Sequence, residues 1–147
     1  MTTLGLDHVS LTVTDLDRSV AFYNGLLGIP ILGRGEEKEG AATALVGGRS
    51  AQFAYADLDL GSGQILELLC FVRPRKESRS VKPDLHNGHF GLRVDDLAQT
   101  LTRLRRSGFE PRTEPVQLEA PAWWHGTTCV YVTDPDGITV ELVERRP

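Results

Sequence analysis

The chain contains an internal repeat, and a repeat constrains the possible folds more than any single motif does. The segment DHVSLTVTDLDRSVAFYNGLLGI near the start aligns with GHFGLRVDDLAQTLTRLRRSGF in the second half, so that His8 corresponds to His89. The two halves also end alike, because GQILELL and GITVELV place Glu67 opposite Glu141. Halves that share both a beginning and an end predict two structural modules of one kind.

Each half begins with a pattern that predicts a strand followed by a helix. Apolar residues alternate with polar ones, which is typical of a strand with one buried face. The apolar set is Val9, Leu11 and Val13 in the first half and Phe90, Leu92 and Val94 in the second. Asp15 and Asp96 then stand where a side-chain oxygen can cap a helix, and apolar residues at helical spacing follow. Gly28 and Gly108 come where a helix ends with a left-handed residue.

Turn signals predict hairpins in the rest of each half. The tetrapeptide DPDG at 134–137 predicts the turn of a hairpin in CVYVTDPDGITVELVE, and GSG at 61–63 predicts the matching turn in LDLGSGQILELL. Each half is therefore expected to fold as βαβββ. Together they would form one domain made of two modules, about 1–72 and 86–147, joined by a loop at 73–85.

Composition excludes several classes of protein. The chain has 147 residues, of which 40% are hydrophobic and 24% charged, so it can bury a core. The formal net charge of −4 argues against nucleic-acid binding as the main role. No apolar run reaches the roughly 18 residues of a membrane helix, and the N-terminus does not resemble a secretory signal. Cys70 and Cys129 are too few for a disulfide framework. We expect a cytoplasmic protein with reduced, buried thiols and with no membrane partner.

Four residues at matching places in the two halves can bind a metal ion: His8, Glu67, His89 and Glu141. A glutamate inside an apolar strand needs a partner, because burying an unpaired carboxylate is costly. Two alternatives are that the glutamates face solvent on edge strands, or that they pair with arginines such as Arg93. Because two histidines and two glutamates occupy matching positions in the two halves, the sequence favours a metal site over both alternatives.

The donor atoms indicate which ions and which chemistry would suit such a site. Imidazole nitrogen and carboxylate oxygen without thiolate suit Ni, Co, Zn, Mn or Fe(II). Four protein ligands on an octahedral ion leave two positions, which a small-molecule substrate with two adjacent oxygens could fill. Such an ion would act as a Lewis acid that stabilises the enediolate or enolate formed when a proton leaves carbon.

The sequence resembles the vicinal oxygen chelate superfamily, which includes glyoxalase I, methylmalonyl-CoA epimerase, extradiol dioxygenases and bleomycin- and fosfomycin-resistance proteins. The resemblance rests on LDHVSLTVTDLDRSVAFYNGLLGIP, GHFGLRVDDL and VYVTDPDGITVELVE. It implies an α+β fold in which two paired βαβββ modules form an open cup-shaped mixed sheet with helices on the outer face. It also implies the four ligands named above and a homodimer.

The resemblance implies an enzyme that moves a proton next to a carbonyl, as a divalent-metal-dependent lyase or isomerase of the glyoxalase I type or as an epimerase. The ligand set is similar to that of bacterial glyoxalase I, whereas epimerases usually have glutamine at the place of Glu67. Glu141 is the preferred proton acceptor and Glu67 the alternative. The other classes are a metal-free binding protein for a small molecule such as an antibiotic and, third, an Fe(II) extradiol-type dioxygenase. The candidate substrate contacts are Trp123, Trp124, His125 and Tyr131.

Overall fold

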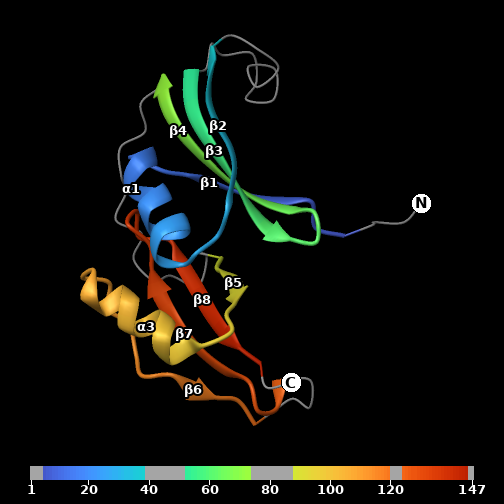
Figure 1. The fold of residues 1–147 in the computed structure, drawn as a ribbon, viewed down its shortest axis with the longest axis vertical. Helices are drawn as coiled ribbons and strands as arrows, with labels where there is room; N and C mark the ends of the chain where they lie inside the picture. The colour runs from blue at the N-terminus through green and yellow to red at the C-terminus, as the bar shows by residue number, and fades with distance from the viewer. Residues whose placement is uncertain (1–4, 39–51, 74–87, 120–123, 146–147) are drawn as a thin grey trace. The chain divides into compact units, whose positions relative to one another are not determined.

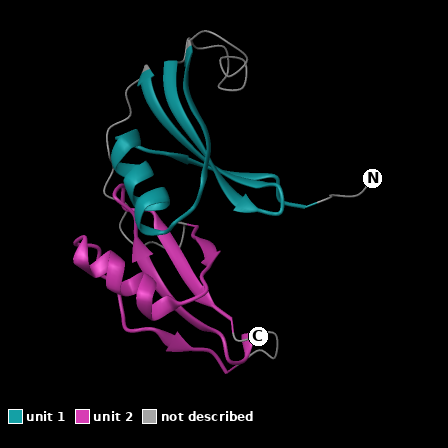
Figure 2. Ribbon diagram, viewed as in Figure 1, with its two compact units in different colours: residues 1–79 teal, residues 80–147 magenta. Residues whose placement is uncertain are grey.

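The structure is a computed structural model, and it describes residues 5–38, 52–73, 88–119 and 124–145. The chain divides into two compact units, residues 1–79 and 80–147, which are described one at a time below (Figure 2). The sequence predicted a linker between the two modules at 73–85. Apart from Arg73, that linker lies outside the described residues, and the single-domain organisation stays a prediction.

The first unit has the order βαβββ and a mixed sheet (Figure 1). Its strands lie in the order β1-β4-β3-β2, with β1 parallel to β4 and the other neighbours antiparallel. The elements are β1 (His8–Thr12), α1 (Leu16–Val20), the π-helix η1 (Ala21–Leu26), β2 (Ile31–Lys38), β3 (Gln52–Gly61) and β4 (Gln64–Arg73).

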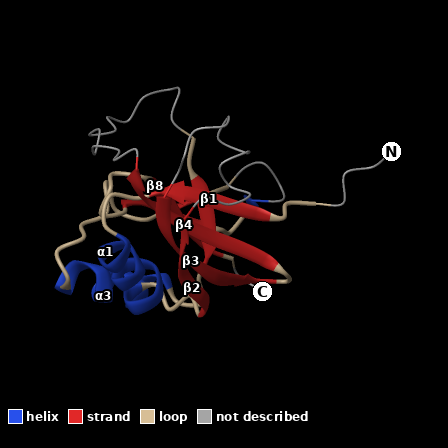
Figure 3. Ribbon diagram, turned by 90° about the horizontal axis from the view of Figure 1, so that it is seen from above, coloured by secondary structure: helices blue, strands red, loops and turns tan. Residues whose placement is uncertain are grey.

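The second unit repeats this topology. Its strands lie in the order β5-β8-β7-β6, with β5 parallel to β8 and the remaining neighbours antiparallel. The elements are β5 (Phe90–Arg93), α3 (Leu97–Arg106), the two-residue strand β6 (Val116–Gln117), β7 (Thr128–Thr133) and β8 (Thr139–Glu144). The helices and strands are distinguished by colour in Figure 3. The predicted α+β class and the two βαβββ modules are confirmed.

Each unit has its own hydrophobic core, on the apolar face of its sheet. The fully or nearly fully buried side chains of the first unit include Leu11, Val13, Phe22, Tyr23, Leu58, Leu66 and Leu68. Those of the second include Leu97, Leu101, Leu104, Val130, Val132, Val140 and Leu142. Burying one such side chain stabilises a fold by roughly 1.5–3 kcal/mol. Because side chains alternate along a strand, the same pattern sends the polar residues of β1, β4, β5 and β8 to the opposite face.

The predicted helix caps are present in both units. The Arg18 backbone N–H donates to the Asp15 carboxylate over 3.0 Å, and that of Gln99 donates to Asp96 over 2.8 Å. In the second unit the Leu97 N–H also donates to the Glu144 carboxylate over 2.6 Å. Aspartate and glutamate at these places supply acceptors for N–H groups that have no partner within the helix.

The first helix differs from its prediction, because a single apolar stripe suggested one regular helix up to Gly28. From Ala21 onward the backbone forms the π-helix η1, in which the Leu27 N–H donates to the Phe22 carbonyl over 3.1 Å. Phe22 and Tyr23 are both buried, and their rings meet edge to face with centroids 5.0 Å apart. A wider turn rotates consecutive residues by a smaller angle, so that both rings can enter the same core.

Both hairpins turn where the sequence predicts. Gly61, Ser62 and Gly63 all have positive φ, between 55° and 85°, at the turn from β3 to β4. In the second hairpin, Asp134 is 4% exposed and its carboxylate accepts from the N–H groups of Asp136 and Ile138 over 2.9 and 2.7 Å. The second turn is therefore held by buried side-chain bonds, whereas in the first the side-chain bond, from the Gly61 N–H to the Asp59 carboxylate, is exposed.

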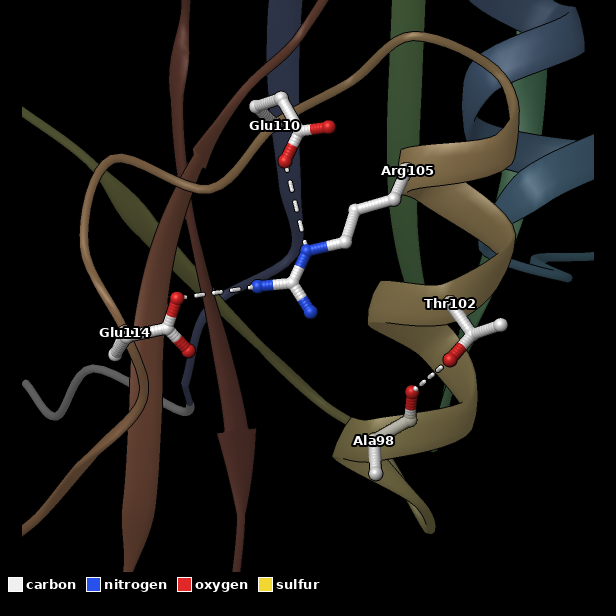
Figure 4. A network of polar contacts seen from close by, with 5 residues as sticks. All are labelled: Ala98, Thr102, Arg105, Glu110 and Glu114. Carbon is white, nitrogen blue, oxygen red and sulfur yellow. Dashed lines mark hydrogen bonds and ion pairs between the residues drawn. The ribbon is translucent and has the colours of Figure 1, made fainter.

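A polar network on α3 illustrates how the exposed side of a unit is organised (Figure 4). Arg105 lies 3.5 Å from both the Glu110 and the Glu114 carboxylates, and the Thr102 hydroxyl donates to the Ala98 carbonyl over 2.9 Å. Exposed ion pairs of this kind contribute little to the free energy of unfolding. Among the described helices none is long and apolar enough to span a membrane. Cys70 and Cys129 are free and half-buried.

Candidate metal centre

The polar face of the second unit brings His89 and Glu141 together. His89 directly precedes β5, whose Gly91 lies opposite Glu141 of the parallel strand β8. The Nε2 atom of His89 is 3.5 Å from the Oε2 atom of Glu141. The Glu141 side chain is only 15% exposed, so it does not face open solvent as one alternative required. Among the described residues its ion-pair partner is His89, not Arg93.

Two residues of β7 contact this pair. The rings of His89 and Tyr131 meet edge to face with centroids 5.0 Å apart. Burial, followed by its hydrogen bond with Glu141, raises the pKa of the Cys129 thiol. Burial and then the nearby Glu141 charge also raise the pKa of the Tyr131 phenol. Both groups therefore keep their protons near neutral pH, and the thiol acts as a donor to the carboxylate.

The first unit holds the equivalent pair on the polar face of its own sheet. Ser10 of β1 pairs with Glu67 of β4, which puts His8 one step along the same face. The Nδ1 atom of His8 hydrogen-bonds the Asp7 carboxylate over 2.8 Å. This bond is the main cause of the raised pKa of His8, with smaller contributions from the charges of Asp7, Glu67 and Asp57. A carboxylate that binds one ring nitrogen orients the imidazole and leaves the other nitrogen free to bind a metal ion.

Asp57 is a residue of this face that the sequence analysis missed. It lies on β3 directly opposite Glu67. Burial raises the pKa of the Asp57 carboxyl, and the neighbouring Glu67 charge raises it further. Counting outward from the predicted turn at 61–63 would have found it, because a hairpin centred on Ser62 pairs residue 57 with residue 67.

The residues of each unit fit a divalent ion in their chemistry. Each unit presents an imidazole and a carboxylate at matching places, and the first unit adds the Asp57 carboxylate; these are donors that Ni, Co, Zn, Mn and Fe(II) accept. Within either unit, no group of three or more described His, Cys, Asp or Glu side chains could hold an ion by itself. His8 with Glu67, and His89 with Glu141, each make half of the predicted site, and their convergence on one ion stays a prediction.

A pocket of about 440 Å³ lies next to Glu141 within the second unit. Its lining is Gly91, Arg93, Trp124, Glu141, Val143 and Arg145. Of the predicted substrate contacts, Trp124 therefore lines this pocket, Tyr131 contacts His89, and His125 is exposed. Trp123 lies outside the described residues. Arg93 and Arg145 were missed as site residues. Alternation along β8 would have placed Arg145 on the face of Glu141, whereas the face of Arg93 follows from the pairing of Gly91 with Glu141.

The fold and the two histidine–glutamate pairs define one class of protein. Residues 5–142 match the family model of the Glyoxalase/Bleomycin resistance protein/Dioxygenase superfamily. The chain belongs to this superfamily, as its resemblance to vicinal oxygen chelate proteins implied.

Several members of the superfamily are similar to the chain over nearly its full length. It is 32% identical to a probable lactoylglutathione lyase of Synechocystis over 142 residues, which cover 93% of this chain and 92% of the relative. It is also 32% identical to a lactoylglutathione lyase of Neisseria meningitidis, covering 95% and 89%. A crystal structure of a glyoxalase family protein from Bacillus cereus superposes with a TM-score of 0.83 at 25% identity, covering 98% and 95%.

Proposed function

We propose that the chain is a divalent-metal-dependent lyase of the glyoxalase I type that forms or breaks a 2-hydroxyacyl thioester. The observation that carries this proposal is the similarity to lactoylglutathione lyases across about nine-tenths of each chain. Lactoylglutathione has a carbonyl and a hydroxyl on neighbouring carbons. It therefore has the two adjacent oxygens expected of a substrate for the predicted metal site.

His8, Glu67, His89 and Glu141 would hold the ion. When bound, the ion supplies Lewis acidity toward the two substrate oxygens. The hydrogen bond from His8 to Asp7 and the ring contact between His89 and Tyr131 orient the two imidazoles. Contacts of this kind favour metal binding, because an imidazole that is already oriented loses less conformational entropy when it binds the ion.

Glu141 acts as the proton carrier in this proposal. It borders the pocket, and Gly91 opposite it has no side chain to cover the carboxylate. The carboxylate takes a proton from the carbon next to the substrate carbonyl and returns it to the neighbouring carbon. The Cys129 thiol donates a hydrogen bond to this carboxylate. Glu67 is the alternative carrier, since it occupies the equivalent place in the first unit.

The experiment measures formation of lactoylglutathione from glutathione and methylglyoxal by the purified protein, after chelation and after addition of Ni, Co, Zn, Mn or Fe(II). We expect turnover that depends on one of these ions and that is lost in Glu141→Gln. Glu119→Gln removes an exposed carboxylate and serves as the control with full activity. A protein that binds none of these ions and turns over nothing would instead be a metal-free binding protein.

The epimerase alternative is tested with the same preparation. An epimerase returns the proton to the same carbon from the opposite face, so it exchanges a substrate hydrogen with D₂O without moving the carbonyl. Formation of a thioester from the glutathione adduct favours the lyase. Hydrogen exchange at the carbon next to the thioester carbonyl of methylmalonyl-CoA, without thioester formation from the glutathione adduct, contradicts it. A homodimer and a cytoplasmic location stay predictions of the sequence, and light scattering of the purified protein tests the first of them.

A further inference from the structure

The pocket beside Glu141 carries more positive than negative charge. Arg93 is opposite Val143 on the neighbouring strand, and Arg145 lies two residues beyond Val143 on β8 itself. The guanidinium group of arginine carries a positive charge in proteins. The lining thus contains two permanent positive charges and one carboxylate.

Neither arginine is neutralised within the described part of the chain. Arg93 makes no hydrogen bond or ion pair with any described residue, and no oxygen of Glu141 lies within ion-pair distance of it. Glu144, which precedes Arg145, points to the opposite face of the sheet, where its carboxylate accepts from the Leu97 N–H over 2.6 Å. A guanidinium at the wall of a pocket, with no internal partner, is available for an anion from solution.

Arg145 is held in place by an aromatic ring. Its guanidinium carbon lies 4.6 Å from the centroid of the Trp124 ring. Stacking on a ring uses the face of the guanidinium and leaves the N–H groups at its edge free to donate. The contact also restricts a long side chain before any ligand arrives, which reduces the entropy lost on binding.

The geometry points to an oxyanion subsite formed by Arg93, Arg145 and Trp124, which favours substrates that carry a carboxylate or phosphate group. The two arginines act as specificity-determining residues. Glu141, which lies between them and His89, is the group that carries the proton. This inference rests on the proposed function only in taking Glu141 as the group that meets the reacting carbon.

Gly91 makes room for such a substrate. A Cβ atom built at this position would lie 3.6 Å from the Oε2 atom of Glu141 and 3.6 Å from Val143, which is ordinary contact. Alanine would therefore fit without moving the carboxylate, whereas a longer side chain would occupy the pocket. A volume of about 440 Å³ accommodates a small acid and part of a larger conjugate.

The test compares the binding of charged and neutral probes to the purified full-length protein by calorimetry. The first pair is malate and its diamide, and the second is glycerol 3-phosphate and glycerol. Arg93→Gln, Arg145→Gln and the double variant are compared with Arg106→Gln. Arg106 is exposed at the end of α3 and does not line the pocket. Arg106→Gln therefore changes the net charge by the same amount as each single pocket variant.

We expect at least one charged probe to bind about tenfold or more tightly than its neutral partner, since an ionic hydrogen bond has about this effect. Each pocket variant should lose about tenfold in affinity for that charged probe and little for the neutral one, with Arg106→Gln unchanged. Preference for malate identifies a carboxylate subsite, and preference for glycerol 3-phosphate identifies a phosphate subsite.

Equal affinity for charged and neutral probes overturns the inference, as does an equal loss in Arg106→Gln. Circular dichroism of each variant shows that the fold is retained. Gly91→Leu adds a second line of evidence, because it should block all four probes while Gly91→Ala does not.

The probes report binding without turnover, so loss of charge selectivity leaves the lyase proposal standing. Conversely, a protein without lyase activity can still show the selectivity.

Discussion

The Nε2 atom of His89 lies 3.5 Å from the Oε2 atom of Glu141, although His89 directly precedes the first strand of the second module and Glu141 lies in its last strand. The parallel pairing of β5 with β8 produces this contact, because it sets Gly91 opposite Glu141 and brings the preceding histidine alongside. The Glu141 side chain is largely shielded from solvent and borders the pocket, whereas the His89 side chain is 43% exposed. An imidazole and a carboxylate held in this way make up half of the predicted metal site.

Replacing Glu141 by glutamine should abolish turnover while the fold is retained. The amide has nearly the same shape but cannot accept the proton, and general-base removal typically lowers a rate about 10²–10⁴-fold. We expect kcat for thioester formation to fall by at least about 100-fold. Steady-state kinetics with saturating metal provide the measurement, and full activity of Glu141→Gln with its metal bound would exclude Glu141 as the proton carrier.

Chelation of the metal should lower the melting temperature. An ion that binds only the folded state stabilises it by about 2.7 kcal/mol at a free concentration 100 times its Kd, which is roughly 5–10 °C for a chain of this size. Thermal unfolding with and without chelator, followed by titration with Ni, Co or Zn, measures the shift. The double variant His8→Ala/His89→Ala should show no shift, and a shift that survives in it would place the ion elsewhere.

Tyr131 should matter to His89 through its ring and not through its hydroxyl. Edge-to-face aromatic pairs are worth about 0.5–1.5 kcal/mol, which corresponds to roughly a 2- to 10-fold change in affinity. We therefore expect Tyr131→Phe to keep the metal affinity and Tyr131→Ala to lower it by that factor. Competition with a fluorescent chelator measures the affinities. Equal losses in both variants would show that the phenol oxygen is needed instead.

The cap of α3 gives a prediction about stability alone. Asp96→Ala removes the acceptor of the Gln99 N–H and should cost about 1 kcal/mol. Asp96→Ser keeps a side-chain oxygen and should cost clearly less. Urea unfolding of the two variants makes the comparison, and identical midpoints would mean that Glu144, which binds the Leu97 N–H, caps the helix without help.

The two hairpin turns should respond differently to loss of their aspartates. Asp134→Ala removes two hydrogen bonds inside a buried turn and should cost about 2–3 kcal/mol. Asp59→Ala removes one exposed bond to the Gly61 N–H and should cost about 1 kcal/mol or less. Denaturant unfolding of both variants tests this ranking, which an equal effect of the two substitutions would contradict.

The sequence alone determined those features that depend on neighbours along the chain. Alternation along the first strand of each half predicted which face is buried, and Leu11 and Val13 are buried as expected. The helices begin after Asp15 and Asp96 and are followed by Gly28 and Gly108, as predicted. These features are local, because capping bonds and left-handed backbone involve residues at most a few positions apart. The repeat added the βαβββ order of both modules.

Only the tertiary structure decided which distant side chains meet. Strand pairing placed Asp57 beside Glu67, and it gathered Arg93, Trp124 and Arg145 around the pocket next to Glu141. Phe22 and Tyr23 both pack into one core, and the backbone there forms a π-helix where the periodicity of the sequence suggested an α-helix. Register and core packing depend on the simultaneous fit of many residues far apart in the chain, so no local pattern reveals them.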